Sequence, residues 1–119
     1  LADVVLDEGE FADARPLLDE SLGINRELGD QTAIAYLIED YAGVAAAEAR
    51  PEKALQLAGF ASALRESIGA PLPPAEQARV DRMIAPARHS LPEPVSTSEW
   101  EAGRTLELEQ AIELALSAS

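Results

Sequence analysis

The sequence predicts an all-α fold in which antiparallel helical hairpins stack as an α-solenoid, closed by a C-terminal capping helix. Three observations support this prediction. The 119 residues are 47% hydrophobic but only 4% aromatic, so the core has to form by close approach of helices with small faces. Apolar residues recur at helical spacing between Gly and Pro breakers. Finally, residues in the first half of the chain match residues 40 positions later.

The first predicted helix covers residues 11–28 and ends at Gly29, a natural C′ residue because glycine tolerates positive φ. Asp30 is then a candidate N-cap for a second helix over residues 31–49. The apolar face of this second helix contains Ile34, Leu37, Ile38, Tyr41, Val44 and Ala45. Because the connection is very short, the two helices are expected to be antiparallel neighbours.

The third predicted helix begins at Pro51, where a missing N–H costs nothing, and ends at Gly69. A shift of 40 residues matches Ala14 with Ala54, Leu17 with Leu57, Leu28 with Ile68 and Gly29 with Gly69. A repeated unit of two helices and two tight turns is typical of an α-solenoid. Since the period exceeds the roughly 34 residues of a tetratricopeptide repeat, the unit is predicted to be a longer, degenerate relative of that repeat.

Prolines and polar caps divide the rest of the chain. Pro71 prevents the third helix from resuming, and Pro74 opens a fourth helix, predicted to kink or fray because Pro86 lies inside it. Pro16 poses the same difficulty for the first helix. Ser96 and Glu99 have the spacing of a capping box and predict a short helix that ends at Gly103. Thr105 is the expected cap of the last helix, whose apolar face is Leu108, Ala111, Ile112, Ala115 and Leu116.

The chain is expected to form one domain over residues 1–119, with repeat hairpins at 1–69 and a Pro-rich turn with capping helices at 70–119. Because it starts at Leu1 and not at Met, we expect a fragment of a longer protein. No cysteine is present, and no run approaches the roughly 18 apolar residues of a membrane helix. A cytoplasmic location without membrane contact is therefore expected.

The net charge of −13 is unevenly distributed, since residues 1–50 hold twelve acidic and three basic side chains. Such a surface repels phosphate backbones, so direct nucleic-acid binding by this segment is disfavoured. Solvated helix faces explain the charge better than an acidic docking surface does. The only basic cluster is Arg79 and Arg82, with Arg65 and Arg88 expected nearby, and internal pairing with Asp81, Glu76 or Glu66 is its simplest role.

Residues that could support catalysis are sparse. His89 is the only imidazole and has no assignable partner, while adjacent carboxylates such as Glu39 and Asp40 point about 100° apart on a helix. The only lysine, Lys53, follows no Gly-rich phosphate-binding loop. We therefore expect no enzyme, no cofactor and no metal site.

Three segments together resemble the C-terminal tetratricopeptide-like region of large bacterial regulators of the LuxR type or of the signal-transduction ATPase class. They are "GEFADARPLLDESLGINRELGD", "RPEKALQLAGFASALRESIGAPLPPAEQARVDRMI" and "WEAGRTLELEQAIELAL". The resemblance implies a longer chain with a nucleotide-binding module upstream of Leu1 and a helix-turn-helix or cyclase-like module elsewhere.

The helical pattern predicts a non-catalytic module for protein interaction, and the resemblance implies that this module acts in signal transduction within a bacterial transcriptional regulator. Its partner would be a protein or a neighbouring domain of the same chain. The first helix of a repeat hairpin usually lines the groove of a solenoid. The candidate partner-binding residues, chosen as inner-face positions of the second helix, are Tyr36, Glu39, Asp40 and Gly43. The alternative is a self-associating structural or adaptor protein, a homodimer formed through an exposed repeat edge.

Overall fold

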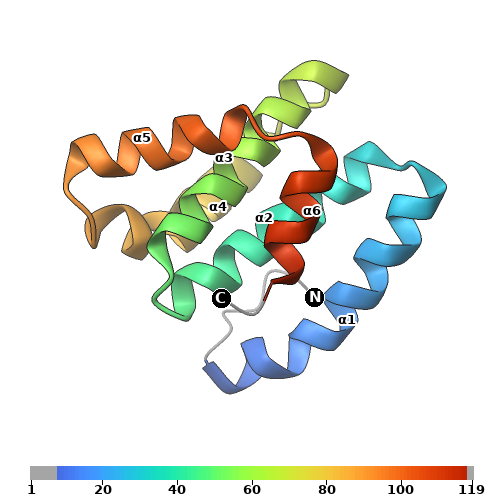
Figure 1. Ribbon diagram of the computed structural model, residues 1–119, viewed down its shortest axis with the longest axis horizontal. Helices are drawn as coiled ribbons and strands as arrows, with labels where there is room; N and C mark the ends of the chain where they lie inside the picture. The colour runs from blue at the N-terminus through green and yellow to red at the C-terminus, as the bar shows by residue number, and fades with distance from the viewer. Residues whose placement is uncertain (1–7, 118–119) are drawn as a thin grey trace.

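The computed structural model describes residues 8–117, with side chains from Arg15 onward. Within that range the fold is all-helical, as predicted. The helices are α1 (Glu8–Leu28), α2 (Gln31–Ala47), α3 (Pro51–Ile68), α4 (Pro74–His89), α5 (Glu93–Arg104) and α6 (Leu108–Leu116). Figure 1 shows α2 and α3 in the middle of the molecule, with α1 at one edge and α5 at the other.

The turns that connect the first four helices follow the predicted local chemistry. Gly29 and Gly69 both adopt positive φ, at +71° and +68°, a conformation that glycine reaches without strain. Asp30 caps α2 by accepting a hydrogen bond from the Ala33 N–H at 3.0 Å. Pro51 and Pro74 are the first residues of α3 and α4. Local sequence rules therefore determine where α2, α3 and α4 begin and where α1 and α3 end. The predicted end of α2 is wrong, because this helix ends at Ala47 and Ala49 adopts a positive φ of +61°.

Two prolines lie inside continuous helices. Helix α1 extends through Pro16, and α4 continues three residues past Pro86 to His89. Both Pro16 and Pro86 are exposed, and neither proline ends its helix.

The predicted boundaries of the last two helices are wrong. Helix α5 begins at Glu93, and Ser96 is buried inside it, where its hydroxyl donates to the Arg88 carbonyl at 2.9 Å. Gly103 does not end that helix, and Thr105 caps the C-terminus of α5, where its hydroxyl donates to the Ala102 carbonyl. The last helix starts at Leu108, after Glu107, whose N–H donates to the Gln110 side chain at 2.8 Å.

The main core lies between α2, α3 and α6, and α1 and α4 add Leu22 and Ile84 to it. Its largest fully buried apolar side chains are Leu22, Ile34, Ile38, Tyr41, Leu57 and Ile112. Helix α6 packs on α2 and α3 and lies between α1 and α3 in Figure 1. Its C-terminal end is fixed by cations, because Arg15 and Lys53 each donate to the Ser117 carbonyl at 2.8 Å. Free carbonyls at a helix C-terminus favour such positive partners.

Positions 40 residues apart have the same backbone conformation at the glycine turns, but the matched apolar side chains differ in burial. Gly29 and Gly69 have the same backbone conformation. In contrast, Leu57 is fully buried while Leu17 is 68% exposed. Ile68 packs against the core, whereas Leu28 is exposed. The side chain of Ala14, the fourth matched position, lies outside the described residues.

Candidate functional site

The four candidate residues of α2 occupy one side of the helix, but they have different environments. Glu39 and Gly43 are buried, while Tyr36 and Asp40 keep exposed surface. Helix α4 packs so closely on α2 at Gly43 that an added Cβ would lie 2.9 Å from the Met83 sulfur. Tyr36 and Asp40 thus have surface open to solvent, whereas Glu39 and Gly43 contact other helices of the protein.

Glu39 forms a buried ion pair with Arg65 of α3. Two parallel hydrogen bonds connect them, from Nε to Oε2 at 2.6 Å and from Nη2 to Oε1 at 3.0 Å. Arg65 also donates to the Ala70 carbonyl at 3.0 Å, and its guanidinium lies 4.3 Å from the centre of the Tyr36 ring. Burial alone would lower the pKa of Arg65, but the hydrogen-bonded Glu39 carboxylate outweighs it and the pKa is raised. The bidentate pair fixes α2 relative to α3, and the hydrogen bond to the Ala70 carbonyl fixes the residues after Gly69 relative to both helices.

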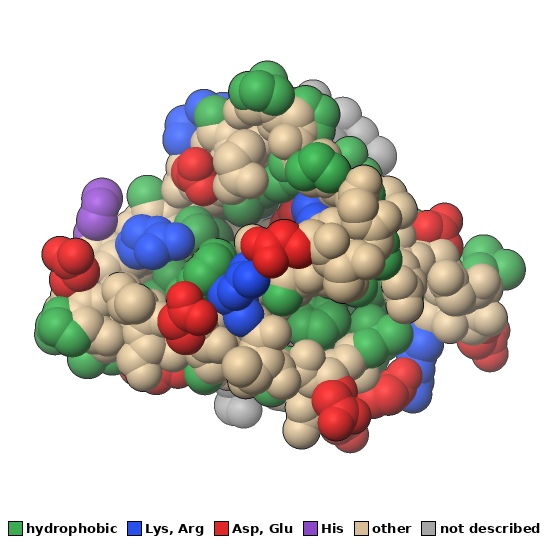
Figure 2. Space-filling model, turned by 90° about the horizontal axis from the view of Figure 1, so that it is seen from above, with side chains coloured by type: hydrophobic (Ala, Val, Ile, Leu, Met, Phe, Trp, Pro, Cys, Tyr) green, Lys and Arg blue, Asp and Glu red, His purple; other side chains and the backbone are tan. Residues whose placement is uncertain are grey.

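The buried pair forms part of the wall of an open cleft of about 460 Å³. We call it the α2–α4 cleft; it is lined by Glu39, Ser62, Arg65, Glu66, Gly69, Pro71, Leu72, Gln77 and Val80. The Pro-rich turn contributes an apolar rim, and α3 and α4 contribute hydroxyl, amide and carboxylate groups. In Figure 2, which looks down on the molecule from the top of Figure 1, acidic and basic side chains are mixed, with hydrophobic side chains exposed between them.

Asp40 is the one described carboxyl group whose pKa is raised to about 6. Burial is the main cause, and the neighbouring Glu39 and Glu76 add to it. Arg79, whose Nη1 is 3.9 Å from an Asp40 oxygen, opposes the shift. Asp40 therefore exchanges a proton in the mildly acidic range.

The predicted basic cluster is dispersed among separate partners. Arg79 lies 3.8 Å from Glu76, as expected, and Arg65 pairs with Glu39 and not with Glu66. Glu66 pairs instead with Arg104 of α5 at 2.7 Å. His89 is exposed at the end of α4. Among the side chains described from Arg15 onward, no group of three or more acidic or histidine residues is placed to hold a metal ion.

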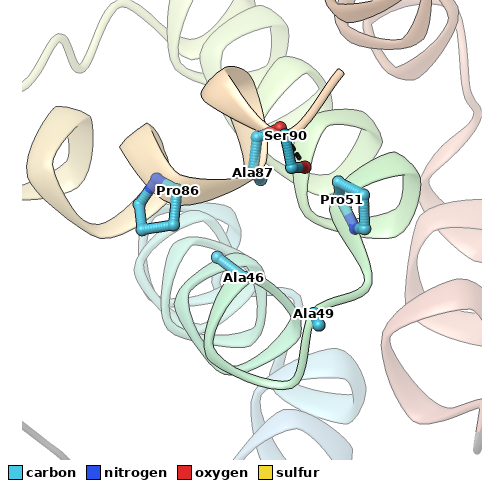
Figure 3. A pocket seen from close by; sticks show the side chains of 6 residues that line it. All are labelled: Ala46, Ala49, Pro51, Pro86, Ala87 and Ser90. Carbon is cyan, nitrogen blue, oxygen red and sulfur yellow. Dashed lines mark hydrogen bonds between the residues drawn. The ribbon is translucent and has the colours of Figure 1, made fainter.

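A second hollow of about 290 Å³ lies between the C-terminal ends of α2 and α4 (Figure 3). Its lining consists of Ala46, Ala49, Pro51, Pro86, Ala87 and Ser90. The Ser90 hydroxyl donates to the Ala87 carbonyl at 3.0 Å. The lining contains no titratable side chain, so it provides shape but no acid or base.

Comparison of the chain with known proteins identifies no relative. No protein-family model matches the chain, and neither a curated protein nor a solved structure shows significant similarity to it. None of the helices in the described part of the chain is both long and apolar enough to cross a membrane.

Proposed function

We propose that this protein is a non-catalytic interaction module that binds a segment of a protein partner in the α2–α4 cleft. The observation that carries the proposal is the combination in one open cleft of an apolar rim, uncharged polar groups and a fixed ion pair. A peptide needs this mixture, because its side chains require apolar contacts and its backbone requires hydrogen-bonding partners. Exposed Tyr36, stacked under Arg65, extends the surface beyond the cleft.

The setting we propose is the C-terminal region of a cytoplasmic bacterial transcriptional regulator of the LuxR type. The support is the sequence resemblance of the three segments named above. In this setting α1–α2 and α3–α4 are successive hairpins of a TPR-like solenoid, an arrangement supported by the equivalent glycine turns 40 residues apart. Partner occupancy of the cleft would be transmitted to other modules of the same chain.

The test is selection of peptides on the purified protein from a random display library, followed by NMR titration of the selected peptide. We expect shift changes at Ser62, Leu72 and Gln77, and loss of binding in Leu72→Glu. Val95→Glu, at an exposed apolar site on α5, is the matched control and should bind normally. Absence of any selected peptide, or shift changes confined to a different face, would contradict the proposal.

Self-association remains a second candidate function because one observation favours it. Three exposed apolar side chains, Leu17, Ile24 and Leu28, lie on α1, and exposed apolar patches often mark contacts between proteins. Multi-angle light scattering over a wide range of protein concentration decides this question. A mass of 12.6 kDa at every concentration would eliminate the homodimer.

A further inference from the structure

The outer face of α1 carries the most exposed apolar side chains of the described structure. Leu17, Ile24 and Leu28 are 68%, 50% and 72% exposed. They lie seven and eleven residues apart, so they form one stripe along the helix. In Figure 1, α1 runs along one edge of the molecule and no other helix lies on its outer side.

The 40-residue correspondence indicates what kind of element would cover this stripe. Leu57 and Ile68, the counterparts of Leu17 and Leu28, pack into the core of the protein. They lie on α3, against which α2 packs. A helix would therefore cover α1 in the way that α2 covers α3.

The charges beside the stripe on α1 indicate which side chains the covering helix would carry. Glu20 and Glu27 are both exposed, and each follows an apolar member of the stripe by three residues, which places it on the adjoining surface. The two arginines of α1 with described side chains are directed elsewhere. Arg15 bonds to the carbonyl of Ser117, and Arg26 pairs with Glu109 of α6.

We propose that Leu17, Ile24 and Leu28, bordered by Glu20 and Glu27, bind an amphipathic helix whose apolar stripe is flanked by basic residues. A basic helix complements both the apolar stripe and the two carboxylates. A second copy of this chain fits worse, because it brings its own glutamates and a further net charge of −13 to the same interface. This surface is separate from the α2–α4 cleft, so the inference does not depend on peptide binding there, and it is an alternative to a homodimer formed through the same three side chains.

The test uses two synthetic helical peptides of about 18 residues, long enough to form a helix. Both carry the same leucine stripe, which is flanked by lysine in one peptide and by glutamate in the other. We expect fluorescence anisotropy to show at least about tenfold tighter binding of the lysine peptide, weakening at about 0.5 M NaCl. The double variant Ile24→Gln and Leu28→Gln should lose at least about tenfold in affinity, whereas Leu116→Gln, at an exposed site on α6, should not.

A charge reversal separates specific recognition from general hydrophobic adhesion. The double variant Glu20→Lys and Glu27→Lys should prefer the glutamate peptide, and unchanged circular dichroism would show that it folds. Equal binding of both peptides, or lysine-peptide binding that survives the Ile24→Gln and Leu28→Gln changes, would overturn the proposal. Light scattering that shows a dimer of the wild type, abolished by the same two changes, would also overturn it in favour of a second copy.

Discussion

Arg65 connects three parts of the chain through one guanidinium group. It is only 5% exposed, and it pairs with Glu39, bonds to the Ala70 carbonyl and covers the Tyr36 ring. Burying two charges is expensive, and only their mutual geometry offsets the loss of hydration. The pair is therefore important for fixing the shape of the cleft wall more than for overall stability.

This view predicts strong coupling between the two residues. Glu39→Gln leaves Arg65 buried without a counter-charge and should destabilise the fold by about 3 kcal/mol, measured by urea unfolding. Replacing both residues, with Glu39→Leu and Arg65→Met, should recover much of that loss. Glu66→Gln, in the exposed Arg104 pair, is the control and should have a much smaller effect. If the double variant is no more stable than Glu39→Gln, the pairing argument fails.

Asp40 gives the folded protein a defined pH dependence. Its pKa is raised from 3.8 to about 6, chiefly by burial. The folded state therefore binds more protons than the unfolded chain between these two values, and stability falls as the pH rises through this window. Asp40→Asn stays neutral at every pH. It should match the wild type near pH 4 and exceed it at pH 7 by up to about 3 kcal/mol.

Urea midpoints at several pH values measure this difference. Asp81→Asn replaces an exposed carboxylate on α4 and serves as the control. The difference in unfolding free energy between this variant and the wild type should not increase from pH 4 to pH 7. An Asp40→Asn effect that is constant from pH 4 to pH 7 would show that burial does not shift this carboxyl group.

Among the helices, α3 and α5 approach so closely that their backbones touch. A Cβ added to Gly59 would lie 2.1 Å from the Trp100 carbonyl oxygen, and one added to Gly103 would lie 1.9 Å from that of Gln56. Backbone atoms cannot move aside as a flexible side chain can. Glycine at these two positions is thus what permits the α3–α5 crossing.

Alanine at either position should separate the two helices. We expect Gly59→Ala and Gly103→Ala each to cost about 3 kcal/mol or more, seen as a lower thermal midpoint by circular dichroism. Gly23→Ala is the matched control, because nothing lies within 4 Å of the added methyl. It should stabilise α1 by about 1 kcal/mol, the difference in helix propensity. Equal effects at all three glycines would refute the close crossing.

The same crossing explains why the sequence predicts some elements and not others. The turns at Gly29 and Gly69 follow from local steric rules, which operate within a few residues. Gly103 satisfies the same rule, yet it lies within α5, where its missing side chain leaves the space that α3 occupies. The Glu39 and Arg65 pair spans 26 positions, and no local pattern connects them. The cleft therefore becomes visible only in three dimensions.

For the whole molecule, the dominant feature is charge. The chain has twenty-two acidic side chains and only nine basic ones. Several of the basic groups, such as Arg65 and Arg15, already have partners inside the fold. The remaining negative charges repel one another across a body of only 38 × 32 × 29 Å. Much of this repulsion acts over distances that salt screens effectively.

Added salt should therefore stabilise the protein. Raising NaCl from about 0.02 M to about 0.5 M should increase the thermal midpoint by about 5 °C, because screening many repulsions outweighs weakening a few exposed ion pairs. Glu101→Lys with Glu113→Lys, at exposed sites on α5 and α6, changes the net charge of −13 by two per site, to about −9, and should reduce this response. Arg82→Lys keeps the charge and should leave the response unchanged. A midpoint that falls with salt would mean that attractive pairs, and not repulsion, dominate the surface.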